Sequence, residues 1–287
     1  MTQDTLPFAL TRPAHVTQVR LVVSDLDLMS RYYQRVIGLK VLEKGSQGEV
    51  LGVGERPLLT LLHQTSAVRA PQNAAGLFHT AFLVPSRAEL AHWLSHAMAL
   101  DVGLEGASDH LVSEALYLTD PEGNGIEIYR DRQPEEWRFG ADGTVEMATR
   151  RLDLRALLAE APTTPWGGMA DGTVIGHIHL QVGNLSQAEG FYRDVMGLKV
   201  MAHYPGASFF ASGGYHHHVA ANIWNSRDAG RRAEGMTGLA GYGLHFNDEV
   251  LLARTLAAVE AQEIETRKTT DGTALKDPWG IGITLSA

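Results

Sequence analysis

The chain contains no cysteine, which excludes disulfide bridges, thiolate metal sites and cysteine nucleophiles. It has no apolar run near the roughly 18 residues that a membrane span requires. Its first residues also lack the basic and apolar segments of a secretory signal. Basic runs are absent as well, and the formal net charge is −9, which argues against a nucleic-acid scaffold. The composition therefore predicts a cytoplasmic globular protein that binds neither membranes nor nucleic acids.

What the chain does contain is an internal repeat. Residues 19–41 align without a gap with residues 178–200, and nine of the 23 positions are identical. Later, DPEGNGIEI at 120–128 aligns with DPWGIGITL at 277–285, with five of nine positions identical. A unit of about 110–120 residues thus occurs twice. We assign one domain to 14–133 and a second to 173–287, joined by a linker at 134–172 with a short helix.

Each unit divides again into two modules of the order strand, helix, three strands. Alternating apolar and polar residues predict the strands, and periodic apolar residues predict the helices. Gly38 and Gly197 are predicted to end helices, and Ser86 and Ser186 to begin them as capping boxes. In the first unit the predicted helices are 27–37 and 86–100, and the predicted strands are 17–24, 40–44, 49–53, 57–63, 78–84, 102–106, 114–119 and 125–130. We therefore predict an α+β protein of four βαβββ modules, in which the first module pairs with the second and the third with the fourth.

These motifs resemble the vicinal oxygen chelate superfamily, which includes glyoxalase I, bleomycin-resistance proteins and extradiol ring-cleaving dioxygenases. The resemblance lies in a strand, a DL turn, a helix ending in YYQRVIGL and the segment DPEGNGIEIY. More narrowly, residues 108–129, together with GHIHL at 176–180 and GGYHHHVAANIW at 213–224, resemble the catechol-2,3-dioxygenase-like branch. The resemblance implies two vicinal oxygen chelate domains in which paired modules curl into a cup. One divalent metal ion in a cup would chelate adjacent oxygens of a substrate.

In the cup of the first pair, strand alternation and the resemblance together point to Gln18, His79 and Glu127 as metal ligands. His79 and Glu127 are separated by 48 residues, close to the spacing in the family. Fe(II) is the favoured ion, and Mn(II) or Zn(II) would also suit this set. Gln18 departs from the usual pair of histidines with one carboxylate. Arg20, two residues further along the same strand, would be costly to bury unpaired, and it is predicted to pair with Glu127 or to contact an anionic substrate.

The second pair shows a larger departure from the family pattern. Thr284 stands where the first pair has Glu127, so the usual ligand triad is broken there. If alternation extends through GGYHHHVAANIW, every second residue from His216 faces inward and the second cup is rich in histidine. The ligands predicted for this cup are His177, His216 and His218, and the predicted substrate contacts are His179, Asn222 and His245. Without a carboxylate the cup could hold Zn(II), or it could bind an aromatic or anionic ligand without metal.

His110 and Tyr117 shortly precede Glu127, and by resemblance they would transfer protons and contact a substrate hydroxyl. The leading hypothesis is a metal-dependent, extradiol-type dioxygenase that cleaves a catechol-like ring. A glyoxalase-like lyase or isomerase acting on a vicinal-oxygen substrate is one alternative. A non-catalytic protein that sequesters a small aromatic compound is another. The sequence leaves the assembly into homo-oligomers open.

Overall fold

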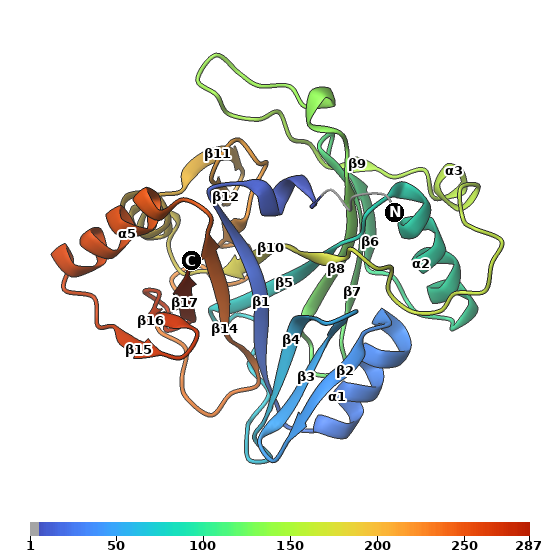
Figure 1. Cartoon of the computed structure of the whole chain (residues 1–287), viewed down its shortest axis with the longest axis horizontal. Helices are drawn as coiled ribbons and strands as arrows, with labels where there is room; N and C mark the ends of the chain where they lie inside the picture. The colour runs from blue at the N-terminus through green and yellow to red at the C-terminus, as the bar shows by residue number, and fades with distance from the viewer. Residues whose placement is uncertain (1–5) are drawn as a thin grey trace.

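The structure is a computed structural model that describes residues 6–287, and it is built around two large sheets (Figure 1). The first has eight strands in the order β15-β16-β17-β14-β1-β4-β3-β2. Its strands are β1 (Ala14–Val23), β2 (Lys40–Gly45), β3 (Gly48–Val53), β4 (Arg56–His63), β14 (Gly238–Phe246), β15 (Arg267–Thr269), β16 (Gly272–Lys276) and β17 (Gly282–Ser286).

The second sheet has nine strands in the order β11-β12-β13-β10-β5-β8-β7-β6-β9. Its strands are β5 (Gly76–Leu83), β6 (Gly106–Asp109), β7 (Ser113–Thr119), β8 (Gly125–Asp131), β9 (Arg150–Arg151), β10 (Val174–Gln181), β11 (Lys199–Tyr204), β12 (Ala207–Ala211) and β13 (Val219–Asn222). The α+β class and the four modules paired into two cups are thereby confirmed.

The pairing of the modules differs from the prediction. The first sheet joins the first module to the fourth through β1 and β14, and the second sheet joins the second module to the third through β5 and β10. Neither 14–133 nor 173–287 therefore makes a sheet by itself. The physical reason is that alternation decides which face a side chain takes, but does not decide which strand lies alongside. Which modules pair depends instead on which sheet edges come together once the linker at 134–172 has joined the two halves of the chain.

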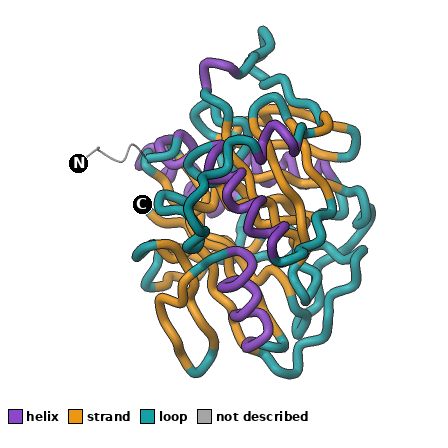
Figure 2. Tube along the Cα trace, turned by 90° about the vertical axis from the view of Figure 1, so that its right-hand side faces the viewer, coloured by secondary structure: helices purple, strands orange, loops and turns teal. Residues whose placement is uncertain are grey.

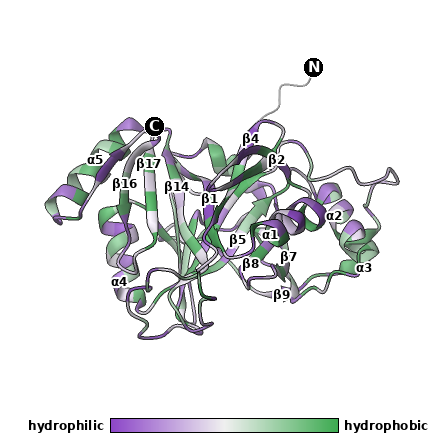
Figure 3. Ribbon diagram, turned by 90° about the horizontal axis from the view of Figure 1, so that it is seen from below, coloured by the Kyte–Doolittle hydropathy of each residue, from purple (hydrophilic) through white to green (hydrophobic). Residues whose placement is uncertain are grey.

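Helices lie at the two ends of the molecule, with the strands between them (Figures 1 and 3), and Figure 2 looks onto the helices of one end, which lie in front of the strands. The α-helices are α1 (Leu26–Tyr32), α2 (Arg87–Ala99), α3 (Leu154–Leu158), α4 (Leu185–Glu189) and α5 (Glu249–Ala261). Two are extended by wider π-helical turns, η2 (Tyr33–Ile37) and η4 (Gly190–Val195), and two short 3₁₀ turns occur at η1 (Phe8–Thr11) and η3 (Pro134–Glu136). Within residues 6–287, no helix is both long and apolar enough to pass through a lipid bilayer.

The helix ends follow local chemistry. Gly38 has φ 88° after η2 and Gly197 has φ 74° after η4, a left-handed conformation that glycine adopts without strain. Ser86 caps α2 by accepting a hydrogen bond from the backbone of Glu89. The predicted cap at Ser186 is wrong, because Asn184, two residues earlier, accepts the bond from Gln187 N at 3.0 Å.

The core forms because one face of each sheet is apolar and is covered by the helices. Leu21 and Val23 of β1, like Ile178 and Leu180 of β10, are fully buried in one apolar cluster that extends across both sheets. The two sheets contact each other through β1 and β10. The opposite face of β5, β8 and β10 is left to carry polar side chains, and this face holds the candidate site.

Candidate metal centre

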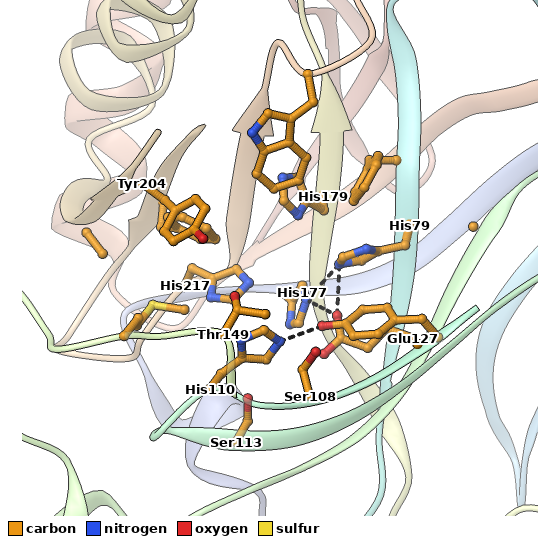
Figure 4. A pocket seen from close by; sticks show the side chains of 18 of the residues that line it. His79, Ser108, His110, Ser113, Glu127, Thr149, His177, His179, Tyr204 and His217 are labelled. Atoms are coloured by element: carbon orange, nitrogen blue, oxygen red, sulfur yellow. Dashed lines mark hydrogen bonds and ion pairs between the residues drawn. The ribbon is translucent and has the colours of Figure 1, made fainter. Parts of the chain in front are cut away.

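Three buried side chains from three neighbouring strands converge on the concave face of the second sheet (Figure 4). They are His79 on β5, Glu127 on β8 and His177 on β10. Glu127 Oε2 lies 2.8 Å from His79 Nε2 and 3.1 Å from His177 Nε2. The two imidazole Nε2 atoms are 3.3 Å apart. The structure thus supplies the second histidine from the other half of the chain.

Strand register brings these groups together. In the parallel pair β5–β8, Ala81 lies opposite Glu127, and in the antiparallel pair β5–β10 it lies opposite His177. Gly125 permits the close approach of β8 to β5, since a Cβ atom there would lie only 2.0 Å from the carbonyl oxygen of Phe78. A larger residue at 125 would therefore push β8, and Glu127 with it, away from His79.

The separations of the three ligand atoms fit a divalent ion. Nitrogen and carboxylate ligands lie about 2.1 Å from such ions, so two ligands at right angles are about 3.0 Å apart, and two at the tetrahedral angle about 3.4 Å. The observed sides of 2.8, 3.1 and 3.3 Å resemble one face of an octahedron. Two histidines and one carboxylate on one face, with the opposite positions free, are typical of non-haem iron sites. The residues therefore fit a single metal site.

Burial alone would raise the pKa of the Glu127 carboxyl, but His177 and His79 donate to it and hold its pKa well below its ordinary value. Burial lowers the pKa of His177 to about 4. At neutral pH the carboxylate is therefore ionised and His177 is neutral, which are the forms that bind metal.

A cavity of about 830 Å³ opens on the three ligand atoms, and we call it the triad cavity. His110 and Tyr117 both line it, as the sequence predicts for a cup-facing pair. The Tyr117 hydroxyl lies 2.7 Å from His110 Nε2, and His110 Nδ1 lies 2.8 Å from the carbonyl oxygen of Ala148. Since a carbonyl only accepts, Nδ1 carries a proton, and in the neutral form of the ring Nε2 accepts from the Tyr117 hydroxyl. The segment 142–149, predicted as linker, thus contributes both a wall of the cavity and the anchor for His110.

A residue that the sequence analysis did not select, His217, also lines the triad cavity, and its ring centroid lies 4.0 Å from that of His177. His217 Nδ1 lies 2.8 Å from His216 Nδ1, and His216 Nε2 lies 2.8 Å from Asp131 Oδ1. The carboxylate fixes the proton of His216 on Nε2, so His216 Nδ1 accepts from His217 Nδ1. The Nε2 atom of His217 is therefore unprotonated and can accept a hydrogen bond or a proton.

The prediction that His216 and His218 face the cup is not met. His216 is bound to Asp131, and His218 Nε2 lies 3.0 Å from the carbonyl oxygen of Ala9 on the other side of the segment. The reason is that β13 begins only at Val219, so these histidines lie in a loop where strand alternation does not apply. The pair Gly213–Gly214 indicates such a loop in the sequence, and both glycines have positive φ in the structure.

Neither Gln18 nor Arg20 lines the triad cavity, and both belong to β1 in the first sheet. Gln18 Nε2 donates to Thr60 Oγ1 at 2.8 Å, and Arg20 Nη2 donates to Thr284 Oγ1 at 3.1 Å. The ligand role predicted for Gln18 and the substrate role predicted for Arg20 are therefore contradicted for this cavity. Both predictions failed with the assumed pairing of the first module with the second.

The remaining predicted residues separate in the same way. His179 lines the triad cavity, and Asn222, which is fully buried behind it, donates to its Nε2 at 3.0 Å. His245 is in the first sheet, where its ring packs 5.2 Å from that of His15 and its Nδ1 lies 3.1 Å from Ser286 Oγ. His245 is thus excluded from the triad cavity by the topology.

Comparison with known proteins agrees with this architecture. Residues 12–128 and 174–285 match the model of the Glyoxalase/Bleomycin resistance protein/Dioxygenase superfamily. The chain belongs to this superfamily. The resemblance seen in the sequence motifs is thereby confirmed.

One curated relative and two solved structures illustrate the relationship. The chain is 37% identical over 272 residues to a protein named catechol-2,3-dioxygenase from Bacillus subtilis, covering 92% of this chain and 94% of the relative. A putative dioxygenase from Bacillus subtilis superposes with a TM-score of 0.64 at 14% identity over 95% of this chain and 84% of the other. Glyoxalase I from Zea mays superposes with a TM-score of 0.55 at 14% identity, covering 97% and 94%. At such low identity the two structures establish the fold alone.

Proposed function

We propose that the protein is a metal-dependent dioxygenase that cleaves the ring of a catechol beside its two hydroxyl groups. One observation carries the proposal: His79, Glu127 and His177 occupy one side of a cavity whose other walls present His217 and the His110–Tyr117 pair. The relative named catechol-2,3-dioxygenase supports the same activity. A protein that only sequesters an aromatic compound has no need for a buried carboxylate between two histidines.

The ion would be held by His79, Glu127 and His177, with Fe(II) the first choice and Mn(II) the second. When bound, such an ion supplies Lewis acidity toward two adjacent hydroxyl groups and a redox partner for O2. Zn(II) fits the ligands equally well but would supply only the Lewis acidity.

The chain's own contribution begins with a base. Burial lowers the pKa of His217 well below its ordinary value, so the ring is neutral, and its hydrogen bond to His216 leaves Nε2 free to accept a proton in the cavity. Asp131 behind His216 stabilises the positive charge that this proton transfer creates, in the same way as the carboxylate of a serine-protease triad supports its histidine. His217 would therefore accept a proton from a substrate hydroxyl group or return one to the product.

The second proton-transfer group is the pair of His110 and Tyr117. The carbonyl of Ala148 holds the His110 ring with Nε2 toward the Tyr117 hydroxyl. A substrate hydroxyl near this pair can pass its proton to His110 Nε2 if the Tyr117 hydroxyl turns from that nitrogen to donate to the substrate oxygen instead. Burial raises the pKa of Tyr117 well above its ordinary value, so the hydroxyl keeps its proton at neutral pH.

The reaction balances without a further reductant. One ring C–C bond breaks, and both atoms of O2 enter the product as new C–O bonds. The two ring carbons lose the four electrons that O2 gains. An isomerase-type reaction in the same cavity would leave O2 untouched, and therefore oxygen consumption separates the two.

The test is anaerobic reconstitution with Fe(II), followed by catechol and air, with oxygen uptake and formation of a yellow ring-fission product as readouts. We expect one O2 consumed per catechol, and loss of both signals in Glu127→Ala. Gln18→Ala is the matched control, because Gln18 lies in the other sheet and should leave both signals intact. Metal binding without oxygen uptake for any catechol would overturn the proposal and favour the isomerase alternative.

A further inference from the structure

An aromatic wall runs from the metal ligands to the mouth of the triad cavity. The Phe78 ring lies 5.3 Å from that of the ligand His79 and 5.2 Å from that of Trp224. Behind them, His179 packs on Phe78 at 4.9 Å and on Phe209 at 5.8 Å. Trp224 stands at the outer end with 45% of its surface exposed. Such a wall offers an apolar surface beside the triad, formed by rings tilted 47–71° to one another.

The charged side chains that line the triad cavity are all carboxylates. Of the described residues that line it, none is a lysine or arginine, while Glu105, Asp142 and Glu146 add carboxylates at its exposed edge. Two guanidinium groups, those of Arg69 and Arg232, line an adjoining cavity of about 440 Å³. Arg232 is already held by the carbonyl oxygens of Met236 and Thr237, and Lys199 by those of Asp142 and Gly143. Arg69, whose guanidinium lies beside Gly123 at the edge of the triad cavity, is the remaining cation there.

A substrate that carries a carboxylate would therefore lose its hydration in the triad cavity without gaining a cationic partner, which is costly. An aryl or alkyl group would instead be transferred from water onto Phe78 and Trp224, which is favourable. The cost of removing a carboxylate from water and the gain from burying an apolar group both favour a substrate whose ring substituent carries no negative charge.

We propose that the triad cavity takes catechols that bear an uncharged apolar substituent, seated along Phe78, Phe209 and Trp224, and rejects catechols that bear a carboxylate. This inference rests on the proposed function, since it names the substrate class of the same site. Phe78 and Trp224 are then the specificity-determining residues.

Binding can be measured without turnover, in Zn(II)-loaded protein under anaerobic conditions, by calorimetry and by tryptophan fluorescence. The probes are catechol, 3- and 4-phenylcatechol, 2,3- and 3,4-dihydroxybenzoate, and dopamine. We expect the better phenylcatechol to bind about tenfold more tightly than catechol, which corresponds to about 55 Å² of apolar surface removed from water. The carboxylated catechols should bind at least about tenfold more weakly than catechol.

Two variants test the wall directly. Trp224→Ala should remove most of the preference for the phenyl group and most of the fluorescence change, since the exposed indole is the one that a bound ring would cover. Trp166→Phe is the matched control, because Trp166 stacks on His96 at 3.5 Å and does not line the cavity. Asn225→Arg, at an exposed position of the lining, should raise the affinity for dihydroxybenzoates selectively.

The outcomes separate this inference from the proposed function. Equal or tighter binding of a dihydroxybenzoate than of a phenylcatechol overturns the inference while leaving a catechol site in place, and sensitivity of that binding to Arg69→Gln would identify the cation responsible. Dopamine binding more tightly than the phenylcatechols would overturn it as well, by showing that the rim carboxylates govern selection. Binding of none of the catechols overturns both the inference and the proposed function.

Discussion

The triad of His79, Glu127 and His177 joins the two halves of the chain. We therefore expect a metal ion bound there to stabilise the whole fold, and we expect this stabilisation to require His177 as much as His79. His79 and Glu127 come from β5 and β8, whereas His177 comes from β10, about 50 residues beyond Glu127 and past the segment 134–172. An ion that binds only the folded chain adds a stabilisation set by its concentration relative to Kd. The perturbation is therefore Fe(II), Mn(II) or Zn(II) added to metal-free protein, in parallel with single ligand substitutions.

The magnitude follows from the size of the chain. At a metal concentration 100 times Kd, the free energy of unfolding rises by about 2.7 kcal/mol. An unfolding entropy of about 2.1 cal/mol/K per residue gives roughly 0.6 kcal/mol/K for 287 residues. The melting temperature should therefore rise by about 4–5 °C, as measured by calorimetry or by circular dichroism under anaerobic conditions.

The variants decide which residues hold the ion. His79→Ala, Glu127→Ala and His177→Ala should each lose nearly all of the shift, and Gln18→Ala should keep it, since Gln18 is bound to Thr60 in the other sheet. A full shift in His177→Ala together with its loss in Gln18→Ala would refute the reasoning. That result would place the ion between the first two modules and would contradict the strand pairing.

Three further outcomes follow from the hydrogen bonds and burial. Tyr117→Phe should lower kcat roughly 100-fold with metal content unchanged, because His110 loses the hydroxyl at 2.7 Å; unchanged turnover would remove this pair from the reaction. Asp131→Asn should lower kcat by about tenfold or more with little change in KM, because the amide no longer fixes the proton of His216; a raised KM with unchanged kcat would indicate a binding defect instead. Burial lowers the pKa of His218 to about 3, so below pH 6.5 the unfolded chain takes up a proton that the folded chain does not. The free energy of unfolding should then fall by up to about 1.4 kcal/mol per pH unit toward pH 4 on account of this residue, and urea titrations of His218→Asn should show a shallower fall.

Much of the fold could be predicted from the sequence because its signals are local. The glycines after η2 and η4 and the alternation along β1, β5, β8 and β10 depend only on neighbouring residues, and the repeat needs only an alignment of the chain with itself. The same alternation correctly placed His79, Glu127 and His177 on cup-facing positions. It could not pair them, because the partner of β5 is decided by contacts between residues about 100 positions apart in sequence.

The histidine tract shows the opposite error, in which a regular pattern was extended into irregular backbone. A strand through Gly213 and Gly214 would have turned His216 and His218 inward, but the loop reverses the choice and directs His217 into the triad cavity. The two neighbours are still needed there, one to hold the His217 proton and the other to fix the loop on Ala9. A glycine pair before a polar run therefore indicates that a strand has ended and that alternation no longer predicts which side chains face inward.

The two sheets finally explain why a duplicated unit keeps one metal site. The strand pairs β1–β14 and β5–β10 are related in the same way to their sheets, but the first pair satisfies its inward polar groups internally, Gln18 with Thr60 and Arg20 with Thr284. Gly241 leaves space that the Arg20 guanidinium fills, since a Cβ atom there would lie 3.0 Å from Arg20 Nη2. Among the described residues, two imidazoles and one carboxylate come within ligand distance of one another only in the second sheet, at His79, Glu127 and His177. We therefore expect metal chemistry in the triad cavity and not in the first sheet.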